Sequence, residues 1–506
     1  MRLKISARKS DLARLQAYRV AEALKKKHPQ IEIEFLFKES LGDKNLTDPL
    51  WKIPEKGVFT EDFYNELVTG ATDMVVHSWK DLPTELKPDT LITATLPRAD
   101  QRDLLLVKKA DFSKIRELKK IRIFSSSPRR AYNLAPFLRE TLPFSLDGVD
   151  FESVRGNIPT RLRKLVESTE VSGLILAKAA LDRLLAAPEE EFLPAQELIR
   201  NALAQVDWMV LPLSVNPNAA AQGALAIEIF SQREDLKKLL QSINDPICFD
   251  SVLKERGVLA QYGGGCHQKI GVAVLPRSYG AIQICRGLTD SGVKLNQNEV
   301  LKESKHKFAE SEMWSGSSES FFTREEIKFQ GIPSGTQALF VAKSSAWPKG
   351  LSYSGILWTA GINTWKKLAK LGLWVHGTQD GLGENEVQHL EILAGKKLNW
   401  VKLTHEGGVQ SEGKKTLATY RLLPKSKAEV ASAEIFQGKK SFFWTSSSQF
   451  LRALELEPSL ADKNHACGPG NSFQIIQDKL QQLRPDKANQ VEVFLSTEEW
   501  KQKCKN

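Results

Sequence analysis

Short strand-like segments alternate with amphipathic helices along the chain, and this alternation limits the possible folds more than any other feature. Residues 2–8 (RLKISAR) alternate as a strand does, and Leu12, Leu15, Ala17 and Val20 then follow at helical spacing. Residues 31–37 (IEIEFLF) form the next strand-like run. Repeated units of this kind pack as a largely parallel sheet covered by helices. The sequence therefore predicts an α/β protein.

The length and the charge of the chain limit its organisation and its partners. A chain of 506 residues is too long for one core, and its net charge of +10 indicates an anionic partner. Arginines stand beside small residues in SSSPRRAYNL (125–134) and VRGNIPTRLRKL (154–165), a setting that suits paired carboxylates or phosphates. This favours a small polyacid over nucleic acid, which needs basic stripes with stacking aromatics.

No apolar leader and no membrane-length apolar run is visible, so we expect a cytoplasmic protein without a membrane partner. The five cysteines are scattered, with no metal-ligand spacing, and we expect reduced thiols and no metal site. One of them, Cys266, follows three glycines in QYGGGCHQKIG (261–271). Glycines permit positive φ, so this stretch predicts a loop that holds the thiol away from its scaffold.

The segment ATDMVVHSWKDLP (71–83) reads as a buried strand whose polar residues begin at His77, the pattern of a site at a strand end. Within it, VHSWKDLPTEL resembles the active-site strand of the hydroxymethylbilane synthase (porphobilinogen deaminase) family. Six further blocks follow that family's order: ARKSDLARLQA, KIPEKGVFTEDFYNEL, SSSPRR, RGNIPTRLRKL, AQGALAIE and GGGCHQKIG. Together they span residues 1 to about 302.

The resemblance implies the head-to-tail polymerisation of four porphobilinogen molecules to hydroxymethylbilane, with loss of ammonia at each step. It places Cys266 at the thioether link to a dipyrromethane cofactor, and leaves Cys248 and Cys285 as core thiols. Asp81 matches the carboxylate that stabilises the cationic intermediate, and Lys80 is the catalytic residue beside it.

The remaining site residues follow from the same blocks. Each pyrrole carries an acetate and a propionate, so the site needs many cations and hydroxyls. The resemblance implies cofactor contacts from Ser78, Lys80, Asp81, Ser126, Ser127, Arg129 and Arg130, and substrate contacts from Arg8, Ser10, Lys52, Lys56, Phe59, Arg155 and Arg161. Glu55 departs from the family's usual GKG pattern, which puts the shape of that loop in doubt.

Residues beyond about 321 resemble uroporphyrinogen-III synthase, in the blocks GILWTAGINTWKKLAKLGLWVHGTQDGLGE, SFFWTSSSQFLRAL and HACGPGNSFQIIQDKL. Asn471 and Ser472 replace the usual Thr-Ala of the last block. Tyr420 stands where that family often has a functional tyrosine near the crossover between lobes. The implied second activity is cyclisation of the bilane to uroporphyrinogen III; a degenerate, non-catalytic C-terminal region is the alternative.

The expected architecture is two periplasmic-binding-protein-like lobes, a small α/β domain with the cofactor cysteine, and a two-lobed α/β synthase-like region. The expected bounds are 1–98 with a return segment 207–235, then 99–206, 236–308, a linker 309–326, and 327–506. A hinged ligand-binding protein would share the first two lobes, but Asp81 and Cys266 argue against it. We expect a monomer with porphobilinogen as its small-molecule substrate.

Overall fold

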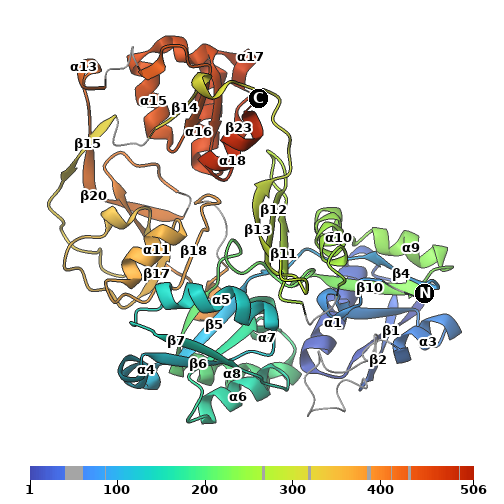
Figure 1. Cartoon of the computed structure of the whole chain (residues 1–506). Helices are drawn as coiled ribbons and strands as arrows, with labels where there is room; N and C mark the ends of the chain where they lie inside the picture. The colour runs from blue at the N-terminus through green and yellow to red at the C-terminus, as the bar shows by residue number, and fades with distance from the viewer. Residues whose placement is uncertain are drawn as a thin grey trace. The chain divides into compact units, whose positions relative to one another are not determined.

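The computed structural model describes residues 1–39, 61–85, 87–264, 268–316, 321–384, 389–411, 413–430, 435–488 and 490–505. The chain divides into two compact units (Figure 1). The N-terminal unit comprises Met1–Pro276, Ile284–Gln297 and His389–Gly395. The C-terminal unit comprises Arg277–Gln283, Asn298–Gln388 and Lys396–Asn506.

The first lobe of the N-terminal unit is a five-stranded sheet of order β2-β1-β3-β10-β4. Strands β1, β2 and β3 are parallel, and β10 runs antiparallel between β3 and β4. In Figure 1 the green strand β10 lies among the blue strands, which shows that the chain returns to this lobe. Its elements are β1 (Arg2–Arg8), α1 (Asp11–Lys27), β2 (Glu32–Lys38), α3 (Glu61–Thr69), β3 (Met74–Ser78), β4 (Thr90–Ala94) and β10 (Leu225–Phe230).

The second lobe repeats this design with a five-stranded sheet of order β7-β6-β8-β5-β9. Strands β7, β6 and β8 are parallel, and β5 runs antiparallel to both β8 and β9. The expected pair of α/β lobes is confirmed. The elements are β5 (Asp103–Lys108), α4 (Phe112–Leu118), β6 (Lys120–Phe124), α5 (Pro128–Thr141), β7 (Gly148–Glu152), α6 (Ile158–Glu167), β8 (Gly173–Ala177), α7 (Lys178–Leu185), α8 (Leu193–Gln205) and β9 (Val206–Val210).

Two of the expected boundaries differ from the structure. The segment 207–235 was expected to return to the first lobe, but its first strand, β9, pairs with β5 in the second sheet, and only β10 makes the return. The third domain was expected from residue 236, yet α9 (Glu234–Gln241) buries Leu236 and Leu240 in the core of the first lobe. Strand pairing places β9, and burial of two leucines places α9. Periodicity within a segment predicts its helix or strand type but not the sheet on which it packs.

A buried ion pair joins the two crossovers between the lobes to the helix α10 (Pro246–Ala260) that follows them. Arg98, in the first crossover, donates to both carboxylate oxygens of Glu255 on α10, at 2.8 and 2.7 Å. The fully buried Glu255 also accepts the backbone N–H of Ala221, in the second crossover, at 2.8 Å. A buried carboxylate is stable only with such a set of donors. The remaining strands of this region, β11 (Gly271–Leu275), β12 (Ile282–Leu288) and β13 (Lys294–Val300), form a three-stranded sheet.

The C-terminal unit contains two further β-sheets. A six-stranded sheet has the order β15-β20-β19-β16-β17-β18, and a four-stranded, fully parallel sheet has the order β14-β21-β22-β23. Its strands and α-helices are β14 (Met313–Gly316), β15 (Phe322–Glu326), β16 (Ala338–Val341), β17 (Ile356–Thr359), α11 (Ile362–Ala369), β18 (Gly377–Thr378), β19 (Trp400–His405), β20 (Lys414–Pro424), α13 (Lys427–Val430), β21 (Ser441–Trp444), α15 (Ser447–Leu456), β22 (Asn464–Cys467), α16 (Asn471–Leu483), α17 (Pro485–Ala488), β23 (Glu492–Val493) and α18 (Thr497–Cys504).

The linker expected at 309–326 is wrong. Strand β14 pairs in parallel with β21, and β15 pairs antiparallel with β20, so this segment supplies a strand to each C-terminal sheet. The physical reason is its aromatic content: the Trp314 ring lies 5.2 Å from the Trp444 ring and 6.1 Å from that of Phe321, which is fully buried. Burial of these rings outweighs the polar, serine-rich composition around them.

Candidate functional site

Asp81 lies directly after β3, where the sequence places the polar end of that strand. It ends a short 3-10 helix, Trp79–Asp81, whose tryptophan is buried and holds the turn against the core. The Asp81 side chain itself is exposed. Ser78, the last residue of β3, exchanges hydrogen bonds with the buried Gln16 of α1 at 2.9 and 3.1 Å. The carboxylate is therefore presented to solvent from a rigid strand end.

Lys80 lies beside Gln222 of the second crossover. Its Nζ donates to Oε1 of Gln222 at 3.3 Å. Burial lowers the pKa of Lys80, the neighbouring Asp81 carboxylate opposes this change, and the positive charge of Arg130 adds to it. The lysine thus belongs to a group of charges drawn from both lobes.

A buried carboxylate that the sequence analysis missed lies at the centre of these charges. Asp103, at the start of β5, is 1 % exposed and accepts hydrogen bonds from both Arg129 and Arg130 at 2.7 to 3.0 Å. The amides of Asn216 and Gln222 add bonds of 2.8 and 2.9 Å. The two arginines hold the pKa of Asp103 well below its usual range, against the effect of burial. Because the aspartate begins a strand in a charged stretch, no pattern in the sequence distinguishes it.

Arg129 and Arg130 lie in the first turn of α5 with their guanidinium groups directed at this carboxylate. Arg129 also donates to the carbonyl of Pro217 at 2.6 Å, and Arg130 to that of Ile175 at 3.2 Å. Two cations around one anion leave a positive charge at the site. Their predicted role in holding the cofactor therefore rests on this surplus charge.

The two serines before α5 use their hydroxyls to shape the loop. Ser126 donates to the Val154 carbonyl at 2.7 Å and accepts the Val154 N–H at 2.9 Å, which ties the end of β6 to the loop after β7. Ser127 is the N-cap of α5 and accepts the N–H of Arg130. Both serines place the arginines that follow them; their predicted contact with the cofactor stays a prediction.

Arg155 and Arg161 complete the cationic part of the site. The Arg161 Nε donates to the carbonyl of Gly156 at 2.7 Å. Burial lowers the pKa of Arg161 to about 10, helped by the charges of Arg130 and Arg155 and opposed by Asp81. A bound carboxylate would relieve this repulsion, as an anion-binding site requires.

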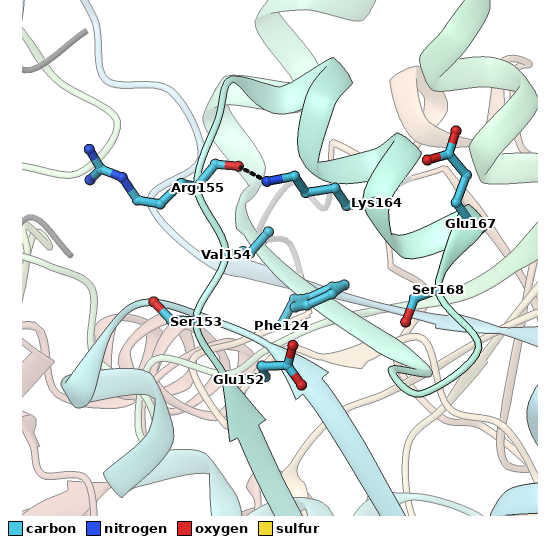
Figure 2. Close-up of a pocket in the computed structure, with 8 residues that line it drawn as sticks. All are labelled: Phe124, Glu152, Ser153, Val154, Arg155, Lys164, Glu167 and Ser168. Atoms are coloured by element: carbon cyan, nitrogen blue, oxygen red, sulfur yellow. Dashed lines mark hydrogen bonds between the residues drawn. The ribbon is translucent and has the colours of Figure 1, made fainter. Parts of the chain in front are cut away.

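An open pocket of about 440 Å³ is lined in part by the loop that carries Arg155. Figure 2 shows the Lys164 amine donating to the Arg155 carbonyl, a bond of 3.2 Å, while the Arg155 guanidinium extends away from Phe124 and the rest of the lining. The Arg155 backbone thus lines the pocket, while its guanidinium is directed out of it. Its lining residues are Phe124, Glu152, Ser153, Val154, Arg155, Lys164, Glu167 and Ser168.

Helix α10 connects the Asp81 turn to the loop that leads to Cys266. Arg256, on this helix, donates to the carbonyls of Trp79 and Leu82 at 3.3 Å each, and to that of Pro83. After the helix, Gly263 and Gly264 have φ values of +91° and +65°. A Cβ on Gly264 would lie 2.7 Å from Oγ1 of Thr84. The loop before Cys266 therefore lies against the segment that follows Asp81, and only glycine allows this approach.

For the other residues predicted in the site, the structure gives a position in the fold or does not describe them. Arg8 ends β1, and Ser10 is the N-cap residue of α1, so both stand at the same sheet end as Ser78. Cys266, Lys52, Lys56, Phe59 and the divergent Glu55 lie outside the described residues. Cys248 and Cys285 are 5 % and 0 % exposed, which confirms them as core thiols.

Tyr420 lies on β20 in the C-terminal unit and is 4 % exposed. The Arg324 guanidinium stacks over its ring at 4.7 Å from the centroid, and burial raises the pKa of its hydroxyl. Its neighbours are those of a packed strand residue, and its predicted functional role stays a prediction.

In the parts of the chain that the structure describes, no cluster of three or more His, Cys, Asp or Glu side chains could hold a metal ion. Over the same residues, no helix is long and apolar enough to cross a membrane.

Curated relatives share the N-terminal part of this chain. Porphobilinogen deaminase of Syntrophomonas wolfei is 37% identical over 290 residues, which is 57% of this chain and 85% of the relative. Porphobilinogen deaminase of Clostridium novyi is 32% identical over 274 residues, or 54% of this chain and 83% of the relative. Among solved structures, YhfZ from Shigella flexneri is 14% identical to this chain, with a TM-score of 0.25. The match covers 51% of this chain and 91% of that one, and it is too distant to indicate a function.

The family model "Porphobilinogen deaminase, dipyromethane cofactor binding domain" matches residues 3–238. These residues include Asp81, Asp103 and the arginines around them. Given this match and relatives that are covered over most of their length, the chain belongs to the porphobilinogen deaminase family.

Proposed function

We propose that the N-terminal half polymerises four porphobilinogen molecules head to tail to hydroxymethylbilane, on a dipyrromethane cofactor held by Cys266. The observation that carries this proposal is the exposed Asp81 carboxylate set among Lys80, Arg130 and Arg161, next to the glycine loop that leads to the cysteine. The residues present fit a polycarboxylate, since the described cations outnumber the anions around them. When bound, the cofactor supplies the anchored pyrrole ring from which the product grows.

In this proposal, the role of each side chain follows from its charge. Asp81 accepts hydrogen bonds from pyrrole N–H groups and stabilises the positive charge that develops when ammonia leaves. Lys80, Arg155 and Arg161 pair with the acetate and propionate groups of the substrate. Asp103 fixes Arg129 and Arg130, so that their charge stays in place as carboxylates accumulate. An alternative, a hinged ligand-binding protein, would need neither Asp81 nor Cys266.

Arg256 is a positioning residue in this proposal, and Arg256→Ala is the test. The substitution removes three hydrogen bonds to carbonyls of the Asp81 turn, so we expect kcat to fall about 10- to 100-fold with little change in KM. The measurement is steady-state porphobilinogen consumption. Lys254→Ala, which removes an exposed pair with Asp250 on the same helix, is the matched control. Unchanged kcat in Arg256→Ala would exclude the positioning role.

We further propose that the C-terminal half cyclises hydroxymethylbilane to uroporphyrinogen III. Its two α/β lobes, with β15 and β20 leading from one sheet to the other, suit a synthase that works by orienting the terminal ring between two lobes. A tether raises the effective concentration of such a synthase to roughly the millimolar range. The alternative is a chain with deaminase activity alone and a degenerate C-terminal region.

Gly470→Ala in the full chain separates these possibilities. Gly470 has a φ of +90°, and a Cβ there would lie 2.5 Å from the Cα of Gly383, so the turn before α16 must move. We expect unchanged porphobilinogen consumption but a product shifted from isomer III to isomer I, measured by chromatography of the oxidised porphyrins. Gly438→Ala, also at positive φ but with open space around it, is the matched control. If the unsubstituted chain makes only isomer I, the C-terminal half has no synthase activity.

A further inference from the structure

A short segment from the C-terminal half of the sequence belongs to the N-terminal unit. Residues His389–Gly395 group with Met1–Pro276, although the residues on both sides of them group with the C-terminal unit. The segment contains the single-turn helix α12 (Glu391–Ala394), which packs against α7 of the second lobe. A segment that leaves its own unit in this way needs specific contacts to hold it.

The first contact comes from α8. Arg200 donates to the carbonyl of Leu393 at 3.0 Å and to that of Ile392 at 2.7 Å. Carbonyls in the last turn of a helix have no partner within it, and a cation there is favourable. Gly395 ends α12 at a φ of +67°, and a Cβ on it would lie 3.2 Å from the Arg200 guanidinium. The helix end thus fits this one arginine.

The second contact comes from α7. The side chain of Lys178 is fully buried, and its Nζ donates to the carbonyl of His389 at 2.8 Å and to Oδ2 of Asp182 at 2.5 Å. Asp100 lies within 3.4 Å of the same nitrogen. A buried ammonium group is stable only when its donors are satisfied. One of its three oxygen partners is therefore supplied by the C-terminal half of the sequence.

The third contribution is apolar. Leu390 is fully buried, and Leu393 is 4 % exposed. They stand three residues apart, so on a helical turn they share one face. Burial of two leucine side chains contributes favourably to holding the segment in place.

We propose that His389–Gly395 is an intramolecular docking segment whose binding surface is the α7–α8 face of the second lobe. The second lobe is then incomplete without this part of the C-terminal half. The segment makes these contacts whether or not either half is catalytic.

Amide hydrogen exchange and lysine labelling of the full chain test the proposal. Arg200→Ala removes both carbonyl contacts and should speed exchange of the amides in 389–395 by at least about tenfold. The pair Leu390→Asp and Leu393→Asp should in addition make Lys178 react with an amine-specific acylating reagent, mapped by peptide mass spectrometry.

Two control substitutions match these changes. Arg139→Ala alters an exposed arginine of α5, and Leu371→Asp places the same charge at a leucine that is 65% exposed. Neither should change exchange or labelling. If Arg200→Ala exchanges at the rate of the unsubstituted chain and Lys178 already reacts there, the segment is not docked and the proposal fails. If the double variant does not fold, amide exchange of residues 389–395 in Arg200→Ala decides the outcome.

Discussion

Asp81→Asn is expected to slow porphobilinogen consumption by at least about a hundredfold while the chain still folds and still carries its cofactor. The amide has nearly the shape of the carboxylate, and the Asp81 side chain is exposed, so the fold loses no buried contact. A neutral amide, however, cannot stabilise a developing cation as a carboxylate does. The substitution also leaves Lys80 and Arg161 without the negative charge that opposes the lowering of their pKa values.

Single-turnover and steady-state rates measure the loss of catalysis, and the intact mass of the same variant shows whether the cofactor is still attached. Asp62→Asn makes the same change at an exposed residue of α3 and should leave the rate unaltered. A rate in Asp81→Asn equal to that of the unsubstituted chain would remove Asp81 from the mechanism.

Strand–helix alternation was sufficient to predict the two lobes, and strand-end polarity marked the Asp81 turn. That Asp81 and the arginines share one site followed only from the family resemblance. The signals that the sequence does carry are local: β3 ends at Ser78, Arg129 and Arg130 follow the N-cap Ser127, and Arg161 follows the N-cap Asn157. The Asp103 cluster was missed because its partners Asn216 and Gln222 come from the second crossover, more than a hundred residues away. Such a cluster exists only once the lobes are assembled.

The errors in the boundaries have the same origin. Composition predicts a linker at 309–326, but Trp314 and Phe321 belong to an aromatic core whose members Phe436, Phe442, Trp444 and Phe450 lie beyond residue 430. The docking segment carries no signal of its own, since its carbonyls are recognised by Arg200 and Lys178 through backbone atoms. The strands of 309–326 and the docking of His389–Gly395 both depend on contacts with distant segments. Periodicity within one segment does not predict such contacts.

Cys266→Ser is expected to abolish turnover and covalent loading together. A hydroxyl is a far weaker nucleophile than a thiolate and does not form the thioether link. The four other cysteines are all buried, and burial raises the pKa of Cys285 and Cys504 to about 11, so none of them replaces the lost thiol. Cys285→Ser is the control for a lost thiol, and it should keep both its loading and its turnover even if its stability falls.

The intact mass of the purified full-length chain tests the central claim most directly. The account predicts a mass above that of the polypeptide by one dipyrromethane, located on the peptide that contains Cys266, and further pyrrole increments when porphobilinogen is added. Cys266→Ser should show the polypeptide mass alone under both conditions. An unsubstituted chain that has only the polypeptide mass, and gains none with porphobilinogen, would contradict the account.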